Sequence, residues 1–120
     1  MKYLLLIYDN EANRAGMSEA EQGKIFQEYM DYTSQIRKSG NYIAGEALQP
    51  TATATTVRVK NGKTLTTDGP FAETREQLGG FYIIDAKDLD EAIGVAKRIP
   101  PASKGTIEIR PVLDIPGLPK

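Results

Sequence analysis

The spacing of apolar and polar residues predicts the order strand, helix, strand, hairpin, strand, helix, strand. Two strands, over residues 2–8 and 80–85, are apolar on both faces, which is typical of strands that are buried on both sides. The hairpin turns at Asn61-Gly62, a pair that strongly favours a two-residue turn. The remaining predicted elements are a helix over 18–39, a strand over 43–48, hairpin strands over 56–60 and 63–67, a helix over 88–99 and a strand over 106–113.

Residues that start and stop helices flank both helical segments. Ser18 and Glu21 have the spacing of a capping box, and Gly40 favours the end of the first helix. Asp88 suits the start of the second helix, and Pro100-Pro101 would end it. Between the first strand and the first helix, residues 9–16 are expected to form a polar loop.

Without the hairpin, this order is the ferredoxin-like split βαβ arrangement, an antiparallel sheet with two helices on one face. We therefore predict an α+β fold with residues 1–113 as one domain and residues 114–120 as an extended tail. The second face of such a sheet would be apolar and bare, which is unusual for a monomer. A homodimer packed sheet to sheet, as a dimeric α+β barrel, would cover it.

The amino-acid composition excludes several catalytic mechanisms and types of metal site. The 120 residues include no cysteine and no histidine, which excludes thiolate nucleophiles and Ser-His-Asp mechanisms. Only oxygen ligands remain for a metal, and we expect neither a metal nor another cofactor. The balance of 15 basic and 16 acidic residues gives no reason to expect nucleic-acid binding. No apolar run approaches the roughly 20 residues of a membrane span, so we expect a cytoplasmic protein without membrane contact.

The segment over residues 68–81, with the sequence DGPFAETREQLGGF, combines turn-forming, charged and aromatic residues at high density. Asp68 would cap a turn and Phe71 would anchor the loop in the core, or the Asp68 carboxylate would face a ligand at a sheet end. Gly79-Gly80 predicts a bulge or a close approach of two backbones.

Three strand residues are further candidates for a ligand site. Glu46 lies mid-strand between small residues, and a buried carboxylate there would have a raised pKa that suits a general base. Arg110 would be its ion-pair partner or a clamp for an anion. Tyr8, at the end of the first strand, would donate a hydrogen bond to a ligand. The plainer alternatives are a salt bridge at the rim of the sheet for Glu46 and Arg110, and simple packing for Tyr8.

The 68–82 segment resembles the signature of the YCII-related family, in its DGPF branch. Similar residues recur at 1–8, 45–48, 53–58 and 108–112, so the resemblance covers nearly the whole chain apart from residues 9–17 and the tail. It implies a dimeric ferredoxin-like α+β fold. Most members are uncharacterised, and a His–Asp pair proposed as the active site of some relatives has no counterpart here, because the chain lacks histidine.

Three functions remain open at this point. The first is a homodimer that binds a small polar or aromatic molecule through Tyr8, Glu46, Asp68 and Arg110, as a sensor or accessory protein. The second is a proton-transfer enzyme, an isomerase or a dehydrochlorinase-like lyase, with Glu46 or Asp68 as base. The third, implied by the resemblance, is a regulator that associates with an extracytoplasmic-function sigma factor.

Overall fold

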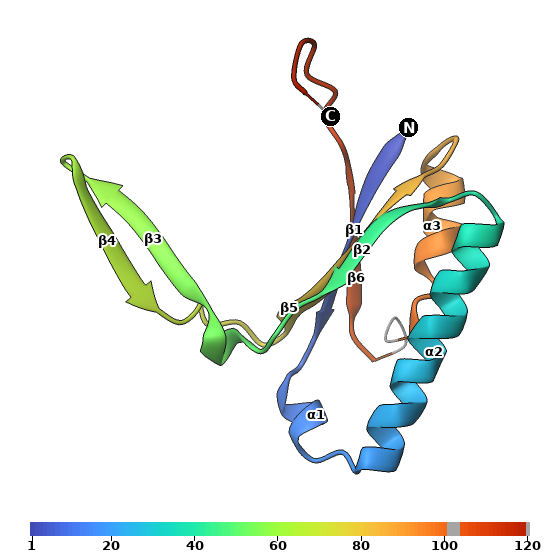
Figure 1. The fold of residues 1–120 in the computed structure, drawn as a ribbon, viewed down its shortest axis with the longest axis horizontal. Coiled ribbons are helices and arrows are strands. Elements are labelled where there is room, and N and C mark those ends of the chain that lie inside the picture. The colour runs from blue at the N-terminus through green and yellow to red at the C-terminus, as the bar shows by residue number, and fades with distance from the viewer. Residues whose placement is uncertain (101–103, 120) are drawn as a thin grey trace.

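Four strands form one antiparallel sheet, in the order β2-β5-β1-β6 (Figure 1). The computed structural model describes residues 1–100 and 104–119. Within them, the sheet consists of β1 (Lys2–Asp9), β2 (Tyr42–Ala47), β5 (Gln77–Asp85) and β6 (Thr106–Pro111). The expected α+β fold with an antiparallel sheet is confirmed.

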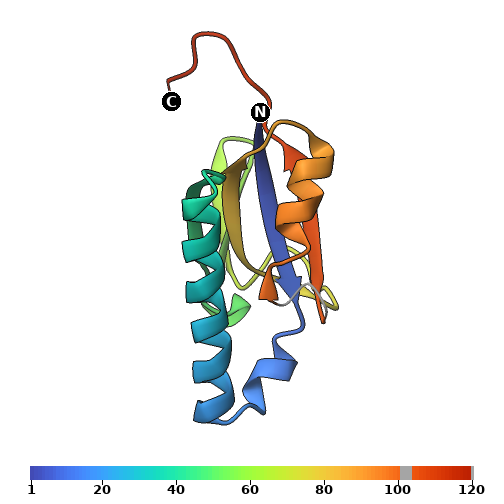
Figure 2. The same cartoon turned by 90° about the vertical axis from the view of Figure 1, so that its right-hand side faces the viewer.

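The two longer helices, α2 (Glu19–Lys38) and α3 (Leu89–Ala96), cover one face of this sheet (Figure 2). The core lies between them and the strands. It consists of alternate residues of β1 and β5, the inner faces of the helices, and two residues outside these elements, Ala86 and Ile99. The strand and helix residues are Tyr3, Leu5, Ile7, Tyr32, Ile36, Tyr82, Ile84, Ala92, Val95 and Ala96. Because side chains alternate across a strand, the remaining residues of β1 and β5 lie on the opposite face, which none of the described helices covers.

Helix α2 begins where the capping box predicts. The Ser18 hydroxyl accepts the Glu21 backbone N–H at 3.1 Å, and the Glu21 carboxylate accepts the Ser18 backbone N–H at 3.4 Å. Gly40, with φ of +83°, follows the end of the helix. The loop expected over residues 9–16 is only partly a loop, because a short helix, α1 (Ala12–Ala15), forms inside it.

Replacing Ser18 with Ala is expected to lower the free energy of unfolding by about 1 kcal/mol, since the helix loses its cap. Urea denaturation followed by circular dichroism measures this change. Ser34→Ala is the matched control, because Ser34 is exposed within α2. Equal stabilities of the two variants would show that the cap contributes nothing.

Helix α3 begins as predicted, with the Asp88 carboxylate accepting the Glu91 backbone N–H at 2.9 Å. It ends at Ala96, three residues before the predicted Ile99, although Ile99 is buried in the core. Pro101, which was expected to end the helix, lies outside the described residues. The described part of the tail, residues 112–119, contains neither helix nor strand. Among the described helices, none is long and apolar enough to cross a membrane.

The predicted hairpin is present, with β3 (Thr55–Lys60) and β4 (Lys63–Asp68) forming a separate two-stranded sheet. Asn61 and Gly62 both have positive φ, of 50° and 77°, as a primed two-residue turn requires. Figure 1 shows the hairpin projecting from the sheet on the side opposite the helices. Its apolar residues remain exposed: Val57 by 60%, Val59 by 68% and Leu65 by 45%.

The Gly79-Gly80 pair forms the bulge that the sequence predicts. Ile7 pairs with Gly80 and Tyr8 with Leu78, so Gly79 is the extra residue of β5. A side chain at Gly80 would also place its Cβ 2.9 Å from the Glu46 carbonyl oxygen, so the backbones of β2 and β5 approach closely there. Both alternatives given for this pair are confirmed.

Candidate functional site

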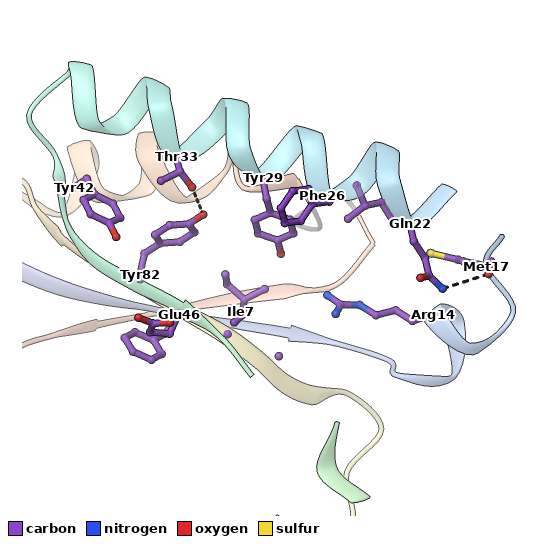
Figure 3. A pocket seen from close by; sticks show the side chains of 16 residues that line it. Ile7, Arg14, Met17, Gln22, Phe26, Tyr29, Thr33, Tyr42, Glu46 and Tyr82 are labelled. Atoms are coloured by element: carbon purple, nitrogen blue, oxygen red, sulfur yellow. Dashed lines mark hydrogen bonds between the residues drawn. The ribbon is translucent and has the colours of Figure 1, made fainter. Parts of the chain in front are cut away.

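A cavity of about 570 Å³ lies between α2 and the sheet, within the range of about 300–1,000 Å³ that is usual for small-molecule sites. Residues of α1, α2, β1, β2 and β5 surround it (Figure 3). The lining residues are Ile7, Arg14, Met17, Gln22, Ile25, Phe26, Tyr29, Thr33, Tyr42, Gly45, Glu46, Ala47, Gly79, Gly80, Phe81 and Tyr82.

The cavity exists because only the second half of α2 packs closely on the sheet. Tyr32 and Ile36 are the buried residues of this 20-residue helix, whereas Ile25 and Tyr29 are half-buried. Glycines on the sheet side leave further room. At Gly45, a Cβ would lie 2.6 Å from the Tyr82 ring, so a larger residue there would displace that ring.

Tyrosines form one wall of the cavity. The Tyr82 hydroxyl lies 2.7 Å from the Thr33 hydroxyl, and burial raises the pKa of Tyr82. Its ring meets the rings of Tyr32 and Tyr42 edge to face, at centroid distances of 5.5 and 6.3 Å. These contacts hold Tyr82 in one orientation and make that end of the cavity rigid.

Tyr29 and Arg14 form one polar part of the cavity. Burial raises the pKa of Tyr29 to about 12, while the nearby Arg14 guanidinium acts in the opposite direction. The Tyr29 hydroxyl is therefore protonated at neutral pH and able to donate a hydrogen bond. Figure 3 shows the Arg14 side chain extending from α1 into the space beneath Tyr29 and Phe26.

Hydrogen bonds on three sides hold the turn that carries Arg14. The Glu11 carboxylate accepts the backbone N–H and the hydroxyl of Thr51, each at 2.8 Å, and Thr51 is the first residue of the 3₁₀ helix η1 (Thr51–Thr53). The Glu11 backbone N–H donates to the Gln77 side chain at 2.9 Å, and the Asn10 side chain accepts the Ala12 N–H at 2.9 Å. The start of α1 is thereby attached to both β5 and the β2–β3 connection.

Two of the predicted site residues lie together on the open face of the sheet, outside the cavity. The Tyr8 hydroxyl donates to the Glu108 carboxylate at 3.4 Å, and Arg110 lies 4.0 Å from the same carboxylate. Burial, followed by the charge of Glu108, raises the pKa of Tyr8. This surface group also contains Glu108, which was not among the predicted site residues.

Glu46 lies at the opposite edge of the sheet from Arg110. Strands β5 and β1 separate the two residues, which places them about 14 Å apart at the usual strand spacing. The expected ion pair between Glu46 and Arg110 is therefore wrong within one chain. Glu46 is exposed, and Figure 3 shows its carboxylate on the far side of the strand from the cavity. A role for Glu46 as a general base requires that its carboxylate be buried, and Glu46 is not buried in the single chain.

Asp68 lies apart from the other three predicted residues. It ends β4 at the base of the hairpin and is exposed. Phe71, which was expected to anchor the loop in the core, is 80% exposed, so this prediction is wrong. The start of the loop is held instead by hydrogen bonds of the Gly69 backbone: its N–H donates to the Ala54 carbonyl at 2.7 Å, and its carbonyl accepts from the Thr56 hydroxyl at 2.8 Å. The cavity thus contains the backbone of Glu46 but none of the four predicted side chains.

The side chains that line the cavity were not predicted from the sequence. Tyr29 was recognisable as a member of the helical repeat of α2, but that pattern does not distinguish core from cavity lining. Arg14 lies in a polar segment without periodicity, and no sequence signal marks it. No group of three or more Asp, Glu, His or Cys residues suited to a metal occurs among the described residues.

Comparison with known proteins gives a consistent assignment. Residues 1–116 match the sequence profile of the YCII-related domain. An uncharacterized protein of Rhizobium meliloti (strain 1021) is 37% identical over 114 residues, which covers 93% of this chain and 92% of that protein. These similarities extend over nearly the whole chain, including the segment that carries Arg14.

Proposed function

This chain belongs to the YCII-related domain family, and we propose that it is a homodimer that binds a small molecule in the cavity between α2 and the sheet, as a sensor or accessory protein. The observation that carries the binding proposal is the cavity itself. It has a volume of about 570 Å³, mostly apolar and aromatic walls, and a small polar region at Arg14 and Tyr29. Cavities of this kind are typical of small-molecule sites.

The open face of the sheet supports the dimer of ferredoxin-like chains. Leu4, Leu6, Phe81 and Ile83 lie there, half-buried and without a covering helix. The radius of gyration, 16.5 Å, exceeds the roughly 14 Å expected of a compact domain of this length. A separate two-stranded hairpin is only marginally stable in water. A second chain against the open face would cover both the sheet and the exposed valines of the hairpin.

In this dimer, Tyr8, Glu46 and Arg110 would lie at or near the interface, because all three belong to the open face. Their predicted contact with a ligand would then involve a site between the chains. The proton-transfer alternative requires Glu46 or Asp68 beside the substrate. The α2–sheet cavity receives neither carboxylate, so it favours binding over that chemistry.

Filling the cavity is expected to abolish ligand-induced stabilisation. Ala47 lines the cavity from β2 and is exposed, so Ala47→Trp introduces bulk there without removing a core side chain. Compounds from a metabolite library that raise the melting temperature of the wild-type protein should lose most of this effect with the variant. A compound present at 100 times its Kd contributes about 2.7 kcal/mol of stabilisation, which a thermal-shift measurement detects readily.

Ala20→Trp is the matched control, because Ala20 is exposed on α2 and does not line the cavity. It should respond to the same compounds as the wild-type protein. If the compounds stabilise Ala47→Trp and Ala20→Trp equally, they bind elsewhere and the cavity is not the site. A soaked crystal of one such compound then locates it.

A further inference from the structure

We propose that the ligand of this cavity is a small organic acid, whose carboxylate is bound by Arg14 and whose flat apolar body lies against the aromatic wall. This inference rests on the proposed function, because it names the chemical class that the cavity accepts. Three features carry it: the charge directed into the cavity, the hydrogen-bond donors around that charge, and the shape of the apolar lining.

Arg14 supplies the charge. Apart from Glu46, whose carboxylate lies on the other side of β2, it is the one ionisable Asp, Glu, Lys or Arg among the lining residues. No salt bridge or hydrogen bond involves its guanidinium within residues 1–100 and 104–119. The neighbouring Asp9 carboxylate accepts the Asn10 backbone N–H at 2.8 Å and does not line the cavity. Arg14 is solvent-exposed, but its guanidinium extends toward an apolar space without an ion-pair partner in the described residues, and such a cation favours an anionic ligand over a neutral or cationic one.

The donors around this charge suit a carboxylate. A guanidinium presents a planar pair of N–H groups that matches the two oxygens of a carboxylate. The Tyr29 hydroxyl, protonated at neutral pH, makes no hydrogen bond within the described residues and lies close enough to Arg14 to sense its charge. Together they offer donors to both oxygens of one monoanion. A phosphate monoester, with three oxygens and up to two charges, would leave part of its charge without a partner.

The apolar lining of the cavity suits a ligand with a planar apolar group. Ile7 lies on the sheet side, Phe26 and Tyr29 project from α2, and Tyr82 closes one end. Figure 3 shows these side chains arranged along a space that runs from Arg14 toward Tyr42. Aromatic rings pack favourably against planar groups in offset or edge-to-face geometry. A ligand with its acid group at Arg14 would thus extend its body toward Tyr82.

The hydrogen bonds of Glu11 make Thr51 a positioning residue for Arg14. Because the Glu11 carboxylate binds both the N–H and the hydroxyl of Thr51, the turn before Arg14 is held before a ligand arrives. Holding a binding group in its bound orientation reduces the entropic cost of association. Loosening this turn should weaken the contact with the acid group while leaving the apolar contacts unchanged.

Matched pairs of acids and amides test the proposal on the full chain. The probes are benzoate with benzamide and 2-naphthoate with 2-naphthamide, and calorimetry or ligand-observed NMR gives each Kd at neutral pH. We expect the wild-type protein to bind each acid about 10- to 100-fold more tightly than its amide, as a charge-assisted hydrogen bond implies. Arg14→Gln should remove this preference, and Arg14→Lys should retain part of it.

Two further variants test whether Thr51 positions Arg14 or only stabilises the fold. Thr51→Val removes the hydroxyl that binds Glu11, and it should reduce the acid-to-amide ratio without changing the affinity for the amide. Arg75→Gln is the control, because Arg75 is exposed and outside the cavity lining. It should behave as the wild-type protein.

The outcomes distinguish this inference from the proposed function. Equal binding of acid and amide by the wild-type protein would overturn the inference. If library compounds still bind and Ala47→Trp blocks them, the proposed small-molecule binding remains supported, although the ligand is not an organic acid. An acid preference that persists in Arg14→Gln or in Ala47→Trp would place the anion elsewhere and would also overturn the inference. If neither acids nor library compounds bind, both proposals are wrong.

Discussion

Replacing Leu6 with Asp is expected to leave each chain folded but to separate the proposed dimer into single chains. Leu6 lies on the open face of β1, between Phe81 of β5 and Glu108 of β6. An unpaired carboxylate buried at an interface costs several kcal/mol, and every 1.4 kcal/mol is a tenfold change in Kd. The dimer dissociation constant should therefore rise by about a hundredfold or more.

Sedimentation velocity at several micromolar concentrations measures this shift. Met30→Asp is the matched control, because Met30 is 53% exposed on α2, away from the open face, and gains the same charge. It should sediment as the wild-type protein does. A wild-type protein that sediments as a single chain at these concentrations would contradict the dimer directly.

Replacing the preceding residue, Leu5, with Ala is expected to produce a different defect, a loss of about 3–5 kcal/mol in the free energy of unfolding. Leu5 is fully buried on the helix side of β1, opposite Tyr82 and Ile109. Truncation removes apolar contacts and leaves a cavity that close-packed neighbours fill only in part. Leu5 should thus affect mainly the stability of the fold, whereas its neighbour Leu6 should affect mainly dimerisation.

Urea denaturation at a fixed protein concentration measures the change, since the stability of a dimer depends on concentration. Leu89→Ala serves as the control, because Leu89 is 52% exposed at the start of α3. Its effect should stay below about 1 kcal/mol. If Leu5→Ala destabilises the protein no more than Leu89→Ala, the assignment of Leu5 to the core is wrong.

The fold was predictable because its signals are local. The capping box of Ser18 and Glu21, the Asn61-Gly62 turn and the Gly79-Gly80 bulge each depend on a few adjacent residues. Strands β1 and β5, whose residues are apolar on both faces, are the two inner strands of the sheet, but only their helix-facing side is buried in the single chain. Boundaries were less accurate at β5, which begins at Gln77 rather than at Gly80.

The site was not predictable from the same signals, because it depends on how distant elements meet. Glu46 and Arg110 were grouped by residue type, but strand order places them at opposite edges. The cavity arises where α2 leaves the sheet, and no local pattern shows the angle of a helix. The turn before Arg14 is held in part by the Glu11 carboxylate, which binds Thr51, 40 residues away in sequence. The roles of Tyr8, Glu46, Asp68 and Arg110 in ligand binding remain predictions.

The bond between Glu11 and Thr51 has a mechanical consequence. Thr51 belongs to η1, which leads directly into the first strand of the hairpin. A displacement of the projecting hairpin would therefore act through η1 and the Glu11 carboxylate on the turn that carries Arg14. The projecting hairpin and the cation that faces the cavity are thus mechanically coupled.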